Sequence, residues 1–157
     1  MTTMIDTPLI TQSEPQITAM IHLTIPTEEI QTVMGPAIQE IYTALGAQGI
    51  TPSGPLFAHH LATPSDVYDI EISVPVATPV EAVGRVQPGT LPATKVARTV
   101  YHGDYTGLGS GWGEFMAWID AEGHPTRTDF WECYVTGPES GPDPSTWRTE
   151  LNKPLVD

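Results

Sequence analysis

Residues 70–76 read IEISVPV and residues 149–155 read TELNKPL, and the two segments align without a gap at an offset of 79 residues. Both have Glu at the second position and Pro at the sixth, and apolar residues coincide at two further positions. Self-similarity of this kind is typical of a duplicated structural unit. The sequence therefore predicts two related halves, each ending in one of these segments.

The same order of elements surrounds both segments. Strands are predicted at residues 17–25, 56–62, 69–76, 96–105, 130–136 and 148–155. A helix is predicted after the first strand of each half, because apolar residues recur there at spacings of three and four. These residues are Ile30, Val33, Met34, Ala37, Ile38, Ile41, Tyr42 and Leu45 in the first half and Leu108, Trp112, Phe115, Met116 and Ile119 in the second. Pro36 interrupts the first pattern and is expected to kink or restart that helix.

Together these elements predict an α+β fold made of two β-α-β-β repeats. The repeats cover about residues 7–76 and 95–155, and the segment 77–94, which is rich in Pro, is predicted to be the linker. Each half is too small to bury its sheet alone, so residues 1–157 are expected to pack as a single domain with antiparallel strands and one main helix per half. A groove between the halves is then the natural ligand site.

The charge of the chain is strongly negative. Its 157 residues include 6 Lys and Arg against 19 Asp and Glu, which gives a net charge of −13, and residues 1–84 contain no Lys or Arg. Nucleic-acid binding depends on cationic side chains that neutralise phosphates, so a nucleic acid is not expected as a partner. A negative surface favours cationic ligands, although the charge alone favours the simpler interpretation that it only maintains solubility.

Several other classes of site and location are excluded on simple grounds. Cys133 is the only cysteine, the five His residues lack metal-ligand spacing, and no apolar run approaches the roughly 18 residues of a membrane span. The glycine-rich residues 107–113 fit neither a dinucleotide-binding nor a phosphate-binding motif and are expected to form the loop that enters the second helix. We therefore expect no metal, no cofactor and no membrane, with Cys133 as an inert core thiol. The first 16 residues do not read as a signal peptide, so a cytoplasmic location is expected.

Four segments of the second half resemble the GyrI-like small-molecule-binding family. They are residues 95–108 (KVARTVYHGDYTGL), 112–119 (WGEFMAWI), 131–134 (WECY) and 147–151 (WRTEL). The resemblance extends over about residues 7–155. It implies tandem β-α-β-β units related by a pseudo-twofold axis, with aromatic and often cationic ligands held between the units against buried glutamates. The same family supplies effector-binding domains of multidrug-responsive regulators.

Strand alternation in residues 130–136 leads to one candidate site. Successive side chains of a strand point to opposite faces, so two sets form. The apolar set, Trp131, Cys133 and Val135, is expected under the helix, and the other set is Phe130, Glu132 and Tyr134. A carboxylate between two aromatic rings suits a flat cation. A glutamate at a solvated strand edge is the alternative, but the resemblance matches Glu132 to the family's acidic ligand-binding position.

The last strand of each half supplies further candidates. Alternation places Glu71 and Glu150 on corresponding faces, from which they are expected to face the groove from opposite sides. The resemblance also matches Glu150 to a pocket acid, whereas Asn152 stands where the family often has Tyr. His60 occupies the position equivalent to Tyr134 and is expected to line the groove.

Two aromatic residues near the start of the second helix complete the set. Tyr105 and Trp112 are expected near the groove, although Trp112 also lies on the apolar stripe of its helix, which favours core packing as its first role and the edge of the pocket as its second.

These residues support three functional hypotheses. The leading one is a stand-alone protein that sequesters or senses a hydrophobic, aromatic, cationic small molecule. The second, which the resemblance implies, is a hydrolase that adds water to the cyclopropane ring of DNA-alkylating natural products, with Glu132, Tyr134 and Glu150 as candidate catalytic residues. The third is an inhibitor that binds a protein partner. A binding pocket and a hydrolytic site would need the same side chains, so the sequence leaves this choice open.

Overall fold

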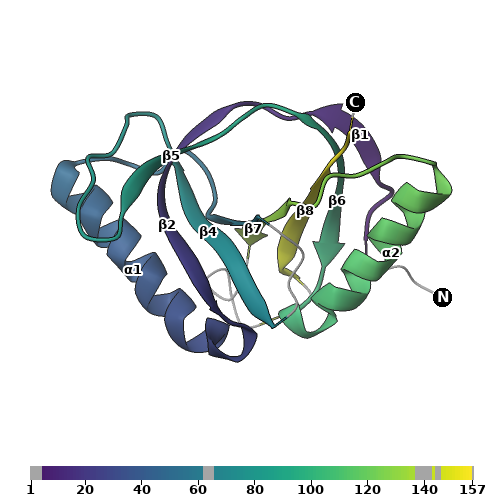
Figure 1. Ribbon diagram of the computed structural model, residues 1–157, viewed down its shortest axis with the longest axis horizontal. Helices are drawn as coiled ribbons and strands as arrows, with labels where there is room; N and C mark the ends of the chain where they lie inside the picture. The colour runs from purple at the N-terminus through teal and green to yellow at the C-terminus, as the bar shows by residue number, and fades with distance from the viewer. Residues whose placement is uncertain (1–4, 62–65, 137–142, 144–145, 157) are drawn as a thin grey trace. The chain divides into compact units, whose positions relative to one another are not determined.

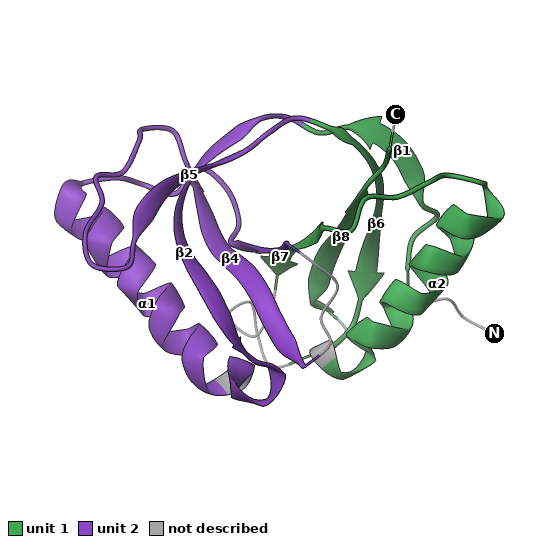
Figure 2. Ribbon diagram, viewed as in Figure 1, with its two compact units in different colours: residues 1–13, 94–157 green, residues 14–93 purple. Residues whose placement is uncertain are grey.

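The structure is a computed structural model that describes residues 5–61, 66–136, 143 and 146–156, without the side chains of Gln31 and Tyr105. Figure 1 shows its helices and strands. The chain divides into two compact units, which Figure 2 colours separately. Unit 1 comprises Met1–Ser13 and Thr94–Asp157, and unit 2 comprises Glu14–Ala93.

Unit 2 consists of one long helix and four antiparallel strands. In chain order they are β2 (Gln16–Pro26), a short 3-10 turn η1 (Thr27–Glu29), α1 (Ile30–Gln48), β3 (Phe57–His60), β4 (Val67–Val76) and β5 (Gln87–Leu91). The strands are ordered β5-β2-β4-β3. In β4, the side chains of Ile70, Ile72 and Val74 are all buried and share one face with buried residues of β2. The apolar face that the sequence predicts for this strand is therefore confirmed.

Unit 1 has the same kinds of element. They are β1 (Leu9–Gln12), β6 (Lys95–His102), a 3-10 turn η2 (Tyr105–Gly107), α2 (Leu108–Ala121), β7 (Phe130–Thr136) and β8 (Arg148–Pro154). The strands are antiparallel and are ordered β1-β6-β8-β7. Apolar residues of α2, β6 and β8, with one residue before β1 and one after β8, form its core. This core comprises Ile5, Ala97, Tyr101, Phe115, Ile119, Leu151 and Leu155, with Ile10, Leu108, Trp112, Met116 and Trp118 packed against it.

The predicted α+β class and the repeated order strand, helix, strand, strand are confirmed. Two strands were not predicted. β5 lies inside the segment 77–94 that the sequence assigns to a linker, and it pairs with β2. β1 pairs with β6, so the N-terminal residues belong to unit 1 and not to the first repeat. The pseudo-twofold relation between the repeats and the single domain stay predictions.

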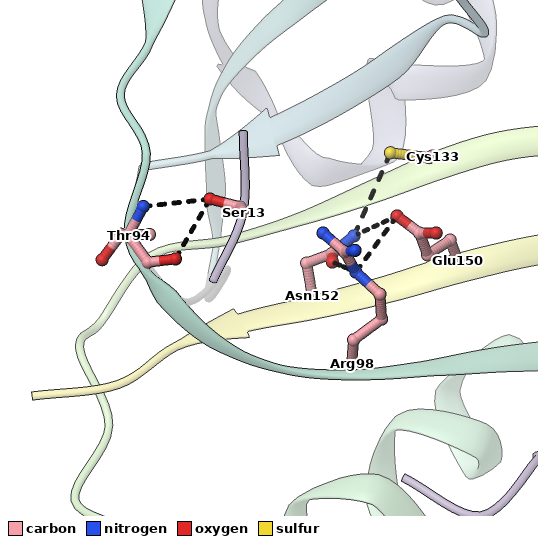
Figure 3. A network of polar contacts seen from close by, with 6 residues as sticks. All are labelled: Ser13, Thr94, Arg98, Cys133, Glu150 and Asn152. Atoms are coloured by element: carbon pink, nitrogen blue, oxygen red, sulfur yellow. Dashed lines mark hydrogen bonds and ion pairs between the residues drawn. The ribbon is translucent and has the colours of Figure 1, made fainter. Parts of the chain in front are cut away.

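A small polar contact links the end of β1 to the start of β6. The Ser13 hydroxyl accepts a hydrogen bond from the Thr94 backbone N–H at 3.0 Å and donates one to the Thr94 carbonyl at 3.1 Å. Figure 3 shows these two bonds of the hydroxyl, and the Ser13 backbone N–H also donates to the same carbonyl, at 2.8 Å. These bonds satisfy backbone groups beyond the last ladder pair and fix the place where the N-terminal segment joins unit 1.

Both helices differ from the sequence prediction in detail. The glycine-rich residues 107–113 do not form an entry loop, because α2 already begins at Leu108. In unit 2, α1 continues through Pro36, which is exposed, so no restart occurs there. Among the helices that the structure describes, none is long and apolar enough to cross a membrane.

Candidate functional site

Glu132 lies in the middle of β7 and is directed toward α2. Its register partner on β8 is Leu151, which belongs to the core beneath that helix, and register partners in neighbouring strands point to the same face. The residue is only 8% exposed. A carboxylate is therefore enclosed in the layer between the sheet and α2, where charged groups are rare unless they are paired.

Three aromatic residues surround this carboxylate. The Trp112 indole Nε1 donates a hydrogen bond to Glu132 Oε2 at 2.6 Å, and the Tyr134 hydroxyl donates to Oε1 at 3.0 Å. The Phe130 ring meets the Trp112 ring edge to face, with centroids 4.8 Å apart. We refer to Phe130, Glu132, Tyr134 and Trp112 as the Glu132 cluster. All three aromatic residues are partly exposed, so the cluster reaches the protein surface.

The electrostatic state of Glu132 is set by its burial. Burial raises the pKa of this carboxyl above its ordinary value, and the hydrogen bonds from Trp112 and Tyr134 oppose the shift. Within the part of the chain that the structure describes, no Lys, Arg or His forms an ion pair with Glu132. Each carboxyl oxygen of Glu132 thus accepts one hydrogen bond from a neutral donor, and each has room to accept a second hydrogen bond.

The buried hydroxyl of Thr149, next to the Glu132 cluster, lacks a hydrogen-bond partner among the described residues. Thr149 is the register partner of Tyr134 on β8, and it is fully buried. Its Oγ1 has no hydrogen-bond partner in the structure. Buried hydroxyl groups are normally hydrogen-bonded, so this atom indicates a place where a polar ligand atom or a water molecule fits.

Lys153 is a member of this face that sequence reasoning missed. Its Nζ lies 5.6 Å from the centroid of the Phe130 ring and donates a hydrogen bond to the Asp129 carbonyl at 3.2 Å. Burial lowers the pKa of Lys153, and the Asp129 carboxylate opposes this effect. Phe130 therefore already interacts with a cation of the protein itself. The alternation Leu151, Lys153 in β8 is the signal that could have placed it on this face.

The predicted faces of β7 were assigned the wrong way round. Glu132 is on the α2 side, whereas Trp131 and Cys133 pair with Asn152 and Glu150 on the opposite side. The prediction assumed that the more apolar set would lie beneath the helix. Both faces of this strand are buried, since Trp131 is 3% exposed and Glu132 is 8% exposed, so polarity does not distinguish them.

Glu150 belongs to a second group of side chains, on the face of unit 1 opposite α2. Its Oε1 lies 3.5 Å from Arg98 Nε and accepts a hydrogen bond from Asn152 Nδ2 at 3.1 Å (Figure 3). Arg98 Nε in turn donates to Asn152 Oδ1 at 2.6 Å. The sheet therefore separates Glu150 from Glu132, although both carboxylates are expected from the sequence to line a ligand site.

Two buried residues near Glu150, Asn152 and Cys133, complete this face of unit 1. Asn152 is fully buried, so it fixes its neighbours rather than leaving a gap where the family often has Tyr. Cys133 is buried as predicted, although on the face opposite α2, and burial raises the pKa of its thiol far above the ordinary value. A thiol of this kind is protonated at neutral pH and therefore a poor nucleophile.

In unit 2 the candidate residues also lie on different faces. Glu71 is close to His59, with its Oε1 3.5 Å from the imidazole Nδ1. His60 pairs with Ile70 and therefore shares the buried face of β4, where its ring lies 5.5 Å from the Tyr68 ring. Burial and the neighbouring His59 lower the pKa of His60 to about 4, so its imidazole is neutral at physiological pH. The Tyr105 side chain lies outside the described residues.

Unit 2 also contains a hollow that the sequence did not indicate. It has a volume of about 620 Å³ and lies between α1 and the segment after β4. Its lining includes Glu40, Ala44 and Gln48 of α1 and Glu81 and Val83 of that segment. None of the candidate residues lines it. Across the described residues, no group of three His, Cys, Asp or Glu side chains could hold a metal ion.

A family model describes almost the whole chain. The GyrI-like small molecule binding domain matches residues 7–155. The comparison with curated proteins gives no match.

Among solved structures, the C-terminal domain of EcmrR is similar to this chain, with 18% identity and a TM-score of 0.84 over 96% of this chain and 98% of that domain. EcmrR in complex with DNA gives the same TM-score and identity over 98% of this chain, which spans only 58% of the EcmrR chain. SAV2435 bound to tetraphenylphosphonium is similar at a TM-score of 0.67 and 14% identity, over 96% of this chain and 94% of SAV2435. A hydrolase from Listeria innocua gives 0.62 and 14%, over 95% of this chain and 91% of the hydrolase.

Proposed function

We propose, because the chain belongs to the family of GyrI-like small-molecule-binding domains, that it binds a hydrophobic aromatic cation at the Glu132 cluster. The observation that carries the proposal is a buried carboxylate that contacts an indole N–H and a phenol but no cationic side chain of the described residues. Such a group is costly to keep charged in the free protein. A bound cation would supply the missing charge.

The aromatic members of the cluster suit the same ligand. The Trp112, Phe130 and Tyr134 rings are partly exposed beside the carboxylate. Aromatic faces attract cations through their quadrupole and also bury apolar ligand surface. A hydrophobic cation therefore gains from both features of the cluster, whereas a neutral molecule of the same shape gains from the rings alone.

The neighbouring structures support this ligand class. Tetraphenylphosphonium, the molecule bound to SAV2435, is a cation enclosed by four phenyl groups. EcmrR carries a similar domain in a longer chain that binds DNA. With 6 Lys and Arg in 157 residues, the present chain offers few groups that could bind phosphates, so we assign it the small-molecule role. A regulatory response to the bound ligand would then pass through a partner protein.

The proposal is tested with a matched pair of planar ligands, N-methylacridinium and acridine, at a pH where acridine is uncharged. The substitution Glu132→Gln should weaken the cation at least about tenfold and acridine hardly at all, since only the cation interacts with the charge. Glu122→Gln is the control, because it removes the same charge from an exposed position at the end of α2. Equal losses for both ligands would exclude the carboxylate as the discriminating group.

Hydrolysis is the second candidate, and the raised pKa of Glu132 favours it. A carboxyl group whose pKa is raised by burial keeps its proton to a higher pH than an ordinary carboxyl and can then act as a general acid, and the Tyr134 hydroxyl is hydrogen-bonded to it. The substrate class would be a strained cyclopropane ring on an aromatic natural product. Time-resolved mass spectrometry with such a compound decides the matter, since hydrolysis adds the mass of one water and binding adds none.

A further inference from the structure

The side chain of Arg98 presents donors that the rest of the protein does not use. It lies on β6, on the face of unit 1 opposite α2, and is 30% exposed. Its Nε contacts Asn152 and Glu150, but within the described residues its two terminal nitrogens have no hydrogen-bond partner. A guanidinium carries four N–H groups on these two nitrogens, arranged in a rigid fork. These groups are available to a ligand.

The buried side chain of Asn152 fixes the orientation of the Arg98 guanidinium. Asn152 is fully buried and accepts the Arg98 Nε–H at 2.6 Å through its Oδ1. Its Nδ2 donates to Glu150 at 3.1 Å and lies 4.0 Å from the Cys133 sulfur (Figure 3). Because the buried amide is held on both sides, it holds the guanidinium plane in one position. Donors that are already oriented lose less entropy when a ligand binds.

The positive charge of the Arg98 guanidinium is compensated by the carboxylate of Glu150. Glu150 Oε1 lies 3.5 Å from Arg98 Nε, so the pair is neutral overall. The protein around it has a net charge of −13. A carboxylate ligand would add a negative charge beside Glu150 and gain little from the compensated guanidinium. An uncharged oxygen acceptor would receive the same hydrogen bonds without that repulsion.

We propose that Arg98 forms a recognition site for an uncharged carbonyl oxygen of a small molecule, such as that of an amide, ester or ketone. Asn152 positions the guanidinium, and Glu150 makes the site selective for neutral acceptors over carboxylates. The site is separate from the Glu132 cluster, because the two lie on opposite faces of the same strands. It relies on the small-molecule role of the family but not on a cationic ligand.

The test uses three naphthalene derivatives that differ in one group: naphthamide, naphthoate and methylnaphthalene. NMR titration of the native chain follows the Arg98 Nε–H and the Asn152 side-chain amide signals. Naphthamide should shift both signals and bind about fivefold or more tightly than methylnaphthalene, as expected for one or two hydrogen bonds to an uncharged acceptor. Naphthoate should bind no better than methylnaphthalene. Absence of any shift with naphthamide would overturn the proposal.

Two variants separate the roles of donor and charge. Arg98→Met keeps an unbranched stem without donors and should make naphthamide bind no better than methylnaphthalene. Glu150→Gln keeps an oxygen that accepts from Asn152 but removes the negative charge, so naphthoate should gain about tenfold. A Glu150→Gln variant that still rejects naphthoate would show that Glu150 does not set the selectivity, and would overturn that part of the inference.

The outcome is independent of the proposed cation site. Glu132→Gln should leave the binding of all three naphthalene compounds unchanged, and Arg98→Met should leave the preference for N-methylacridinium over acridine unchanged. Thermal unfolding of each variant establishes that it folds. If the preference for the cation is lost and the preference for the carbonyl is kept, the function proposed for Glu132 fails and the inference about Arg98 stands.

Discussion

Glu132 is a residue whose carboxyl group costs the fold stability, because it is buried where an apolar side chain would pack without that cost. An apolar residue at this position would pack beneath α2 without any electrostatic penalty, because the site is 8% exposed and its register partner is Leu151. The carboxylate instead receives hydrogen bonds from Trp112 and Tyr134. Groups whose ionisation is disfavoured in this way are concentrated at functional sites. This is why we place the ligand here.

The burial of Glu132 predicts how stability depends on pH. Its pKa is raised in the folded state, so the folded chain holds the proton more tightly than the unfolded chain. The contribution of this residue to the free energy of unfolding is therefore fully present below its ordinary pKa of 4.5 and is lost as the pH rises through the raised value.

The substitution Glu132→Gln should remove this loss of unfolding free energy at higher pH. The Gln oxygen can accept from Trp112 and its amide can donate to the Tyr134 hydroxyl, so both contacts are kept. We expect the variant to have a higher melting temperature than the native chain at neutral pH and a similar one in acid. Melting curves of both proteins over a pH series measure this difference, and a difference that does not change with pH would contradict a raised pKa.

At the scale of the elements, the first turns of α2 are unusual because they contain several glycines. Gly111 is buried and faces the Tyr101 ring, where an added Cβ would lie 2.7 Å from Cδ1. Gly113 has no atom within 4 Å of such a Cβ. Close packing therefore requires glycine at position 111 but not at position 113. Both glycines weaken the helix, because they are more flexible than other residues in the unfolded chain.

This contrast predicts opposite effects for the same substitution. Gly113→Ala should raise the free energy of unfolding by about 0.5–1 kcal/mol, because Ala restricts the unfolded chain and favours the helix. Gly111→Ala should lower it despite the same gain in propensity, because the methyl group displaces Tyr101. Urea unfolding of the two variants tests the prediction, and an equal gain for both would mean that α2 does not pack closely on β6.

Elements that depend on local patterns could be predicted, and those that depend on distant partners could not. The periodicity of α1 and the alternation in β4 are local, and both were predicted correctly. β5 reads QPGTL, which has little strand propensity, and it forms only because it pairs with β2. The contact between Arg98 and Asn152 joins residues 54 positions apart and requires a strand register that no local pattern contains.

At the scale of the whole molecule, charge is distributed unevenly along the chain. All six Lys and Arg follow residue 84, and acidic residues outnumber them by 19 to 6. Arg98 and Lys153 are engaged by neighbouring groups, with Glu150 and the Asp129 carbonyl respectively. The field that an approaching ligand experiences is therefore dominated by uncompensated carboxylates. Such a field acts on the rate of encounter more than on the final contacts.

This field predicts a salt dependence that separates encounter from recognition. The association rate constant of N-methylacridinium should fall several-fold between about 0.01 M and 0.2 M salt, since the screening length shrinks from about 30 Å to below 10 Å. Acridine has no charge to steer, so its rate constant should stay constant under the same conditions. Glu132→Gln should accelerate dissociation of the cation but leave the salt dependence of association nearly unchanged, because one buried carboxyl contributes little to a net charge of −13. Stopped-flow fluorescence provides both rate constants. If the association of the cation proved insensitive to salt, the acidic surface would have no part in attracting the ligand, and its charge would serve solubility alone.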